Sequence, residues 1–363
     1  MSKKDIQEEI KQLTDLLKKE KEADLAYYRK KMIGTSLKER RKQGVCWYPV
    51  TMERTKFDAG ERLIIKVSRP PEHLDAHLFQ SGKLVSLFSN SSGLGDAEDS
   101  VNGVVNQVKK QEMHITLNAD RIPEWIHDGH LGIQLLFDEH AYREMEKALQ
   151  LLLNAKDDRI NELKDILLGT KAARFTDQPS IRDIGMNDSQ NEALHKIQNA
   201  LDVAIIHGPP GTGKTTTVIQ AICETLKTED QILVCAPSNA AVDLLTERLS
   251  DQEVEVLRIG HPARVTEAIL NKTLDARIAN HPDYKKIKTL RKKADECFAN
   301  ANKYKRQFGA AEKHQRNSLK DEGRKLRDEA KHLTYYITND ILAKCQVIAC
   351  TLVGANNQMV KGL

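Results

Sequence analysis

The first apolar pattern along this chain has the period of an α-helix. Within residues 5–30, apolar side chains recur every three or four residues, which predicts one buried helix face. Four side chains share this face: Ile6, Ile10, Leu13 and Leu17. A second helical pattern runs over residues 139–168, and we expect it to stop at Gly169.

Between these two patterns, residues 46–138 have a β character. Turn residues separate six short runs rich in β-branched residues, which predicts a small all-β barrel or sandwich. The runs are CWYPVTMERT, RLIIKVS, KLVSLFSN, VNGVVNQVKK, EMHITLN and LGIQLLF. Residues 90–103 contain many Gly, Ser and Asn residues and predict an exposed loop. A β module between two helical segments is expected of a lobe inserted between the arms of a helical stalk.

Beyond Thr170 the pattern alternates between strand and helix. Ser189 and Glu192 predict a capping box at the start of the first helix. Four apolar runs predict buried strands, at residues 203–207, 232–236, 254–259 and 347–351. Because amphipathic helices separate continuous apolar strands, the sequence predicts an α/β fold with a parallel sheet covered on both faces.

A basic segment interrupts this alternation. Residues 281–340 hold 16 Lys and Arg against 9 Asp and Glu, although the whole chain has a net charge of only +4. The segment is almost free of Gly and Pro, which predicts two long helices that turn near Gly309. It forms either a solvated hairpin or an arm against a nucleic-acid backbone. Four aromatic side chains are expected in the hairpin core rather than as platforms for stacking bases: Tyr304, Phe308, Tyr335 and Tyr336.

These patterns divide the chain into five parts. They are an N-terminal stalk helix (1–45), a β-barrel-like domain (46–138), a second stalk helix (139–170), an incomplete α/β domain (171–280 and 341–363) and the inserted basic hairpin (281–340). No apolar run approaches the ~20 residues that span a bilayer, and the start has no apolar signal-peptide core. Six scattered cysteines without a CxxC motif predict reduced thiols in a cytoplasmic protein, and no His has the spacing of a metal ligand, so no structural metal is expected. We also expect a monomer, and a nuclear location is an alternative in a eukaryote.

The strongest chemical signal follows the run at residues 203–207. The segment from Gly208 to Thr215 reads GPPGTGKT and fits the phosphate-binding loop pattern between a strand and a helix. Its N–H groups and the helix N-terminus are suited to ATP phosphates, with Lys214 on the β- and γ-phosphates and the Thr215 hydroxyl on Mg²⁺. The expected nucleotide contacts are Gly208, Pro209, Pro210, Gly211, Thr212, Gly213, Lys214, Thr215 and Thr216, with Lys214 and Thr215 catalytic.

Two flanking segments extend this signal. Gln190 can pair with the adenine edge, or it is a surface residue at a helix start. Residues 236–243 (APSNAAVD) follow a strand, where doubly wound sheets bind ligands. They either contact nucleic-acid phosphates or form an ordinary helix N-cap. The expected nucleic-acid contacts are Pro237, Ser238 and Asn239, with Thr351 and Gly354 at the end of a later strand.

The order of these motifs resembles superfamily 1 helicases of the nonsense-mediated-decay and immunoglobulin-mu-binding type. The resemblance covers residues 186–274 and 346–355 most specifically. It implies a RecA-like domain that carries an inserted helical hairpin and is preceded by a β-barrel on a helical stalk. It also implies ATP and Mg²⁺ as cofactors, and 5′-to-3′ movement along single-stranded DNA or RNA.

One departure from the family concerns the Walker-B carboxylates. No Asp-Glu pair follows Gly354, and Phe137-Asp138-Glu139 precedes the phosphate loop and is assigned to the β module. The chain is therefore expected to be an N-terminal helicase half that binds ATP and single strands but turns over little ATP alone. Two alternatives are an AAA+-like ATPase acting on proteins and a nucleotide-gated nucleic-acid-binding module without enzymatic activity.

Overall fold

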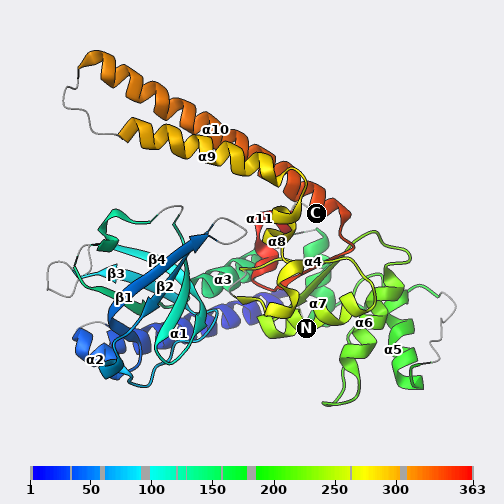
Figure 1. Ribbon diagram of the computed structural model, residues 1–363. Coiled ribbons are helices and arrows are strands. Elements are labelled where there is room, and N and C mark those ends of the chain that lie inside the picture. The colour runs from blue at the N-terminus through cyan, green and yellow to red at the C-terminus, as the bar shows by residue number, and fades with distance from the viewer. Residues whose placement is uncertain are drawn as a thin grey trace.

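The computed structural model places a β-barrel and a small parallel sheet at opposite ends of a helical stalk, with two long helices projecting away (Figure 1). It describes residues 3–32, 35–57, 62–90, 99–119, 122–127, 129–156, 158–177, 185–261, 264–302 and 309–361. None of the helices in these ranges is long and apolar enough to cross a membrane.

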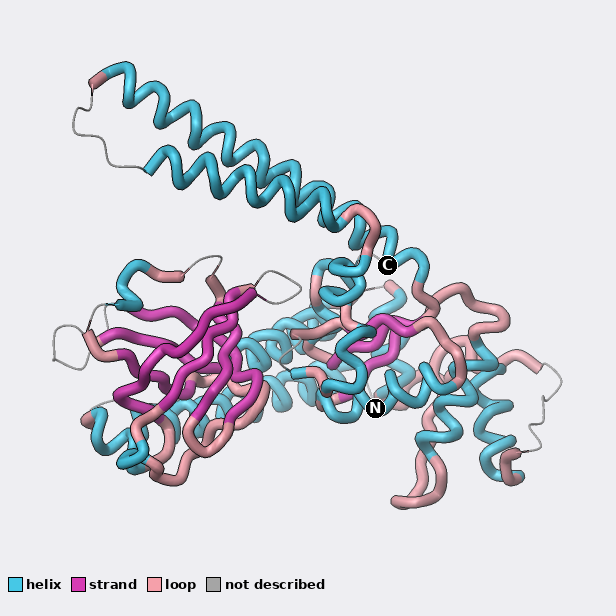
Figure 2. The backbone as a smooth tube through the Cα atoms, in the orientation of Figure 1, coloured by secondary structure: helices cyan, strands magenta, loops and turns pink. Residues whose placement is uncertain are grey.

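The β module is a closed antiparallel barrel (magenta strands on the left of Figure 2). Its strands are β1 (Cys46–Phe57), β2 (Leu63–Ser68), β3 (Leu84–Ser89), β4 (Asp99–Val108), β5 (Glu112–Leu117) and β6 (Leu131–Leu135), in the order β1-β2-β5-β4-β3-β6. Alternate side chains, among them Ile65, Leu87 and Ile115, fill the barrel and are fully buried. The short 3₁₀ helices η1 (Pro71–His73) and η2 (Glu124–His127) close its loops.

The barrel decides between the two predicted β architectures and corrects one predicted loop. Residues 99–103, expected to be loop, begin β4 and pair with β3. Residues 91–98 of that loop lie outside the described part of the chain. Polar and Gly residues are tolerated in this strand because its first residues lie on the outer surface, and Gly103 leaves room for the β5 backbone.

The stalk consists of α1 (Lys3–Met32), α3 (Glu139–Asn154) and α4 (Arg159–Leu167), with α2 (Leu37–Lys42) between α1 and the barrel. Polar contacts join α1 to α3, because the Tyr142 hydroxyl donates to Asp24 Oδ2 at 2.7 Å and Lys21 pairs with Glu139 and Glu146. The helical stretch predicted over residues 139–168 is divided between two helices, α3 and α4.

Two details of the stalk differ from the predicted pattern. Ile6 and Ile10 are buried, but Leu13 is 47% exposed, so the predicted apolar face is wrong at that position. The less exposed face instead continues through Thr14 and Leu17, which follow Ile10 at spacings of four and three residues. Gly169 ends α4 as expected, with a φ of +75° that glycine adopts without steric cost.

The parallel sheet contains β7 (Ile232–Ala236), β9 (Val347–Thr351) and β8 (Val256–Arg258), in the order β7-β9-β8. Helices α6 (Lys214–Thr225) and α7 (Asn239–Asp251) cover one face, where Ile219, Val242 and Leu249 meet the strands. Helices α8 (Leu274–Asn280), α9 (Tyr284–Asn302) and α10 (Ala310–Lys344) cover the other face. The remaining elements are α5 (Asp188–Asn199), α11 (Gln358–Lys361), η4 (Glu267–Lys272) and η5 (Gly354–Asn356).

The strand predicted over residues 203–207, here named the lead-in segment, is wrong. It is coil, and Ile205 is 83% exposed. An apolar run becomes a buried strand only beside a partner strand, and among the described residues the sheet is limited to β7, β9 and β8. The lead-in segment therefore enters the phosphate loop outside the sheet.

Helices α9 and α10 lie side by side over most of their length and project from the sheet (Figure 1). Phe298 packs beneath Arg327, whose guanidinium lies 4.5 Å from the ring centroid. The expected core positions of Tyr335 and Tyr336 are wrong, because these side chains are 69% and 63% exposed. The inward face of α10 is occupied instead by smaller apolar residues such as Ile337. Tyr304 and Phe308 lie outside the described residues.

A close contact in the barrel yields a stability prediction. Gly132 on β6 lies opposite Phe88 on β3, and a Cβ added there would approach the ring to 2.3 Å. Phe88 has little room to move away, since it is only 3% exposed and its ring stacks on Tyr48. We expect Gly132→Ala to lower the free energy of unfolding by about 1–3 kcal/mol through overpacking.

Chemical denaturation of the wild type, both single variants and the double variant measures this effect. Phe88→Leu should make room for the added methyl group, so Gly132→Ala should cost much less in the Phe88→Leu background than in the wild type. Equal costs in both backgrounds would contradict a steric origin.

Candidate nucleotide and nucleic-acid site

The phosphate loop has the backbone that its glycines predict. Gly211 and Gly213 both have a φ of +83°, in the left-handed region where other residues are strained. Gly213 is also the N-cap residue of α6, and no side chain caps this helix. The N–H groups of the first turn therefore face outward without a competing side-chain acceptor, at the positive end of the helix dipole.

The side chain of Lys214 folds back over this loop. Its Nζ donates to the carbonyl oxygens of Gly208 and Pro209, at 2.5 and 2.6 Å. The Thr212 hydroxyl donates to the Pro209 carbonyl at 2.9 Å and tightens the same turn. A cation and a set of N–H donors thus converge on a loop whose glycines leave room for a ligand, which fits the polyphosphate of ATP. Thr215, the expected Mg²⁺ ligand, is exposed on the first turn.

Gln190 lies against the phosphate loop from the neighbouring helix α5. The predicted capping box of Ser189 and Glu192 is wrong, since Asn187 is the N-cap and Gln190 the third residue of the helix. Gln190 Oε1 accepts from the Asn187 N–H at 3.1 Å, while Nε2 donates to the Thr212 carbonyl at 3.3 Å. A helix that starts two residues earlier places Gln190 where its amide links the α5 cap to the phosphate loop.

A second group of predicted residues meets at one edge of the parallel sheet. Ala236 ends β7 and lies in register with Thr351 at the end of β9, so the segments that follow both strands emerge together. Ser238 caps α7 by accepting from the Ala241 N–H at 3.2 Å. The Thr351 hydroxyl accepts from the Gly354 N–H at 3.1 Å. Ser238 and Thr351 therefore also shape their own turns.

Pro237 and Asn239 flank the Ser238 cap. Pro237 is exposed, whereas Asn239 is half-buried and accepts a hydrogen bond at Oδ1 from Arg258 Nη2, at 2.9 Å. Arg258 is fully buried and pairs with the buried Asp243 at 2.9 Å. Sequence reasoning missed this pair. One signal was available: Arg258 lies within an apolar run predicted to be a buried strand. A buried guanidinium needs a carboxylate partner, so a nearby buried Asp or Glu could have been expected.

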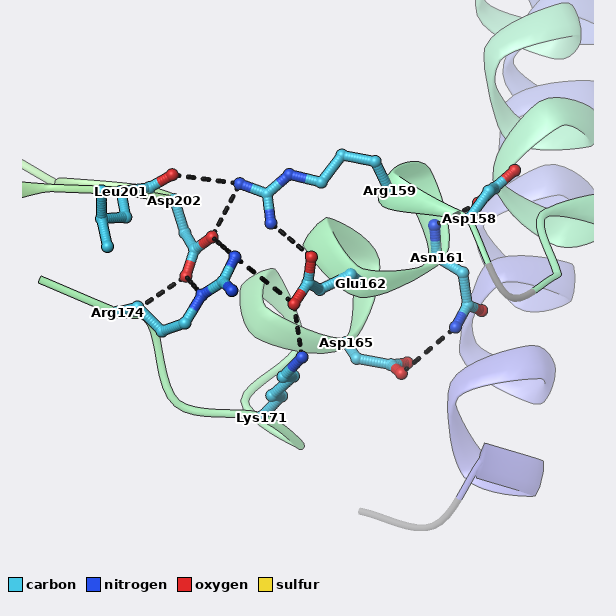
Figure 3. A network of polar contacts seen from close by, with 9 residues as sticks. All are labelled: Asp158, Arg159, Asn161, Glu162, Asp165, Lys171, Arg174, Leu201 and Asp202. Atoms are coloured by element: carbon cyan, nitrogen blue, oxygen red, sulfur yellow. Dashed lines mark hydrogen bonds and ion pairs between the residues drawn. The ribbon is translucent and has the colours of Figure 1, made fainter.

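An ion-pair network connects Asp202, the residue directly before the lead-in segment, to the stalk (Figure 3). Asp202 binds Arg174 at 2.9 Å and Arg159 at 2.7 Å, and these contacts, with that of the Arg174 side chain the largest, lower the pKa of Asp202. Glu162 on α4 binds Lys171 and Arg159, which lower its pKa in that order. Asp202, directly before residues 203–207, is thereby tied to α4, and the lowered pKa values keep both carboxylates ionised at neutral pH.

The Asp138-Glu139 pair lies at the start of the stalk helix α3, where Asp138 is the N-cap residue. Glu139 binds Lys21 at 3.4 Å, and Asp138 lies 3.9 Å from Arg264. Within the described ranges, no group of three or more His, Cys, Asp or Glu residues is arranged to hold a metal ion.

Comparisons with known proteins match both halves of this architecture. A family model described as "AAA domain" matches residues 185–363, and one described as "Helicase SMUBP-2/HCS1, 1B domain" matches residues 10–128. The first range contains the phosphate loop and the parallel sheet, and the second contains most of the barrel.

Three curated proteins illustrate the relatives. "DNA-binding protein SMUBP-2" of Rattus norvegicus is 30% identical over 96% of this chain and 35% of its own length. "DNA polymerase alpha-associated DNA helicase A" of Schizosaccharomyces pombe is 29% identical over 85% of this chain and 48% of its own length. "Regulator of nonsense transcripts 1" of Dictyostelium discoideum is 32% identical over 47% of this chain and 12% of its own length.

This chain thus spans less than half of the length of each of these relatives. The two family models together span most of the barrel, the phosphate loop and the segments that follow β7 and β9. The chain belongs to the superfamily 1 helicases of the SMUBP-2 and nonsense-transcript-regulator type.

Proposed function

We propose that this chain is the ATP-binding and nucleic-acid-binding part of an ATP-dependent helicase that moves 5′-to-3′ along single-stranded DNA or RNA. The observation that carries the proposal is the phosphate loop, with two left-handed glycines, an uncapped helix N-terminus and the Lys214 ammonium at one point. This combination favours a nucleoside triphosphate over a neutral ligand.

Residues 208–216 would bind the nucleotide. The N–H groups of the loop and of the first turn of α6 bind phosphate oxygens, and Lys214 exchanges its two carbonyl acceptors for the β- and γ-phosphates. The exposed Thr215 hydroxyl would hold Mg²⁺, which supplies charge neutralisation on the phosphates when bound. Gln190 would turn its amide from the Thr212 carbonyl to the adenine edge, at the cost of one hydrogen bond at 3.3 Å.

Single-stranded nucleic acid would cross the sheet edge where β7 and β9 end. Pro237, Ser238, Asn239, Thr351 and Gly354 are the proposed contacts. Backbone and small polar groups there suit phosphates and sugars, so binding would be largely independent of sequence. We further propose that α9 and α10 form a hairpin inserted into the ATP-binding domain and add non-specific affinity through their basic residues.

We also propose the division into five parts at the residue bounds given in the sequence analysis. The proposed protein is monomeric and uses ATP and Mg²⁺. Two other functions remain as outcomes of the tests below. An AAA+-like ATPase acting on proteins would bind ATP without a preference for single strands. A nucleotide-gated binding module would bind both ligands, and its parent protein would have no ATPase activity.

The first prediction concerns nucleotide affinity. Lys214→Ala removes the ammonium that faces the phosphates, so we expect the dissociation constant for ATP·Mg²⁺ to rise by about 10- to 100-fold, as for loss of a hydrogen bond to a charged group. Titration with a fluorescent ATP analogue measures this. Lys227→Ala is the matched control, since Lys227 follows the other end of α6 and pairs with Glu224. Equal effects of both substitutions would refute the assigned phosphate loop.

The second prediction concerns base selectivity. Gln190→Glu keeps an oxygen for the Asn187 N–H but loses the amide donor, and its added charge repels ATP and GTP alike. The ratio of ATP to GTP affinity should therefore fall toward one in Gln190→Glu and in Gln190→Ala. A wild-type chain that binds ATP and GTP equally would show that Gln190 only caps α5.

The third prediction concerns salt. If the single strand is held through about four phosphates, its affinity should fall by roughly 50-fold between 50 and 200 mM salt. Fluorescence anisotropy with a labelled oligothymidylate measures the fall, and an oligomer with an uncharged backbone is the control. Equal affinity at both salt concentrations, or a preference for blunt duplex, would contradict the proposed interface.

A further inference from the structure

The buried guanidinium of Arg258 controls the direction of one proposed nucleic-acid contact. Arg258 ends β8, has no exposed surface and reaches the first residue of α7. We infer that Arg258 is a positioning residue that turns the Asn239 amide so that its NH₂ group donates to a nucleic-acid phosphate. The inference rests on the proposed function and names one group of that interface.

The chemistry of the two side chains fixes the orientation of the amide. A guanidinium only donates hydrogen bonds, so the atom of Asn239 that faces Arg258 Nη2 at 2.9 Å must be the acceptor oxygen. The Nδ2 group of Asn239 then points away from Arg258. Among the interactions found in the described residues, Nδ2 has no acceptor, while the side chain is half-buried at the start of α7. An outward NH₂ at a helix N-terminus is suited to an anion.

Two further hydrogen bonds hold the rest of the guanidinium. Its Nε donates to Asp243 Oδ1 at 2.9 Å, and its Nη1 donates to the Ile259 carbonyl at 2.5 Å. A Cβ on Gly260 would approach Nη1 to 2.8 Å, so a larger residue there would press on the guanidinium. The second oxygen of Asp243 accepts from the Thr266 N–H at 2.8 Å. With both ions satisfied, the buried pair holds Arg258 in one geometry.

This geometry matters at the sheet edge. Asn239 adjoins the Ser238 cap, and β7 leaves the sheet at Ala236 in register with Thr351. The Asn239 NH₂ group therefore belongs to the edge assigned to the single strand. If the amide were free to rotate, half of its orientations would present the amide oxygen to the phosphate. The two oxygen acceptors would then repel each other.

A double-mutant cycle on single-strand affinity tests the inference. Asn239→Ala should weaken binding of a labelled oligothymidylate by about tenfold, the loss expected for one hydrogen bond to a charged group. Arg258→Lys keeps a cation for Asp243 but loses the planar fork, so the amide is released and binding should weaken by roughly three- to tenfold. In the Asn239→Ala background, Arg258→Lys should weaken binding no further. ATP affinity should stay unchanged throughout.

Two controls separate positioning from general damage. Arg277→Lys alters a guanidinium that binds Glu255 and the Val256 carbonyl near the other end of β8, and should bind the oligonucleotide as the wild type does. Asn239→Asp keeps an acceptor for Arg258 and replaces the outward NH₂ by an oxygen. It should bind at least as weakly as Asn239→Ala, whereas Ala240→Asp, with the same added charge on an exposed neighbour, should lose less.

The outcomes distinguish this inference from the function on which it rests. A wild-type chain that does not bind the oligonucleotide even at low salt would overturn the proposed function. If the wild type binds the oligonucleotide but Arg258→Lys weakens binding in the Asn239→Ala background as much as it does alone, only the positioning role of Arg258 would be overturned. If Arg258→Lys does not fold, Asn239→Asp decides, because wild-type affinity in that variant would show that Asn239 serves only to hold Arg258.

Discussion

The central position of β9 is the constraint on which the candidate site depends. This strand pairs in parallel with β7 on one side and with β8 on the other, and its residues 347–350 are almost completely buried. Because β9 follows β8 only after the long excursion through α8, α9 and α10, the sheet closes late in the sequence. Its register with β7 brings residues 236–239 and 351–354 to one edge, and its pairing with β8 places Arg258 beneath α7.

The same pairing explains which parts of the fold the sequence could predict. The runs at residues 232–236 and 347–351 were bounded correctly, because continuous apolar runs between helices are typical of buried parallel strands. The phosphate loop was also predictable, since its glycines and its lysine must occur at fixed spacing. The lead-in segment has the same apolar composition as the true strands, but pattern alone does not reveal whether a neighbouring strand is present.

Other misses arose from tertiary contacts that spacing does not encode. The capping box forms at Asn187, two residues before the predicted Ser189, which gives Gln190 a dual contact. The buried pair of Arg258 and Asp243 spans 15 residues between a strand and a helix, so it has no local signature. The segment after Arg258 also meets the barrel, since Arg264 packs near Gly82. One short stretch thus adjoins both the barrel and the Asp243 carboxylate, which accepts from Thr266.

Helix α10 has a mechanical consequence for the sheet. It runs unbroken through 35 residues, about 52 Å at the usual rise per residue, and β9 begins three residues after it ends. Its last turn is tied to the start of β7, because Gln231 Nε2 donates to the carbonyls of Leu342 and Cys345, both at 2.8 Å. A long stiff rod clamped at one end acts as a lever. A force applied to the N-terminal end of α10 would therefore act as a torque on the first residues of β7 and β9, about the hydrogen bonds of Gln231.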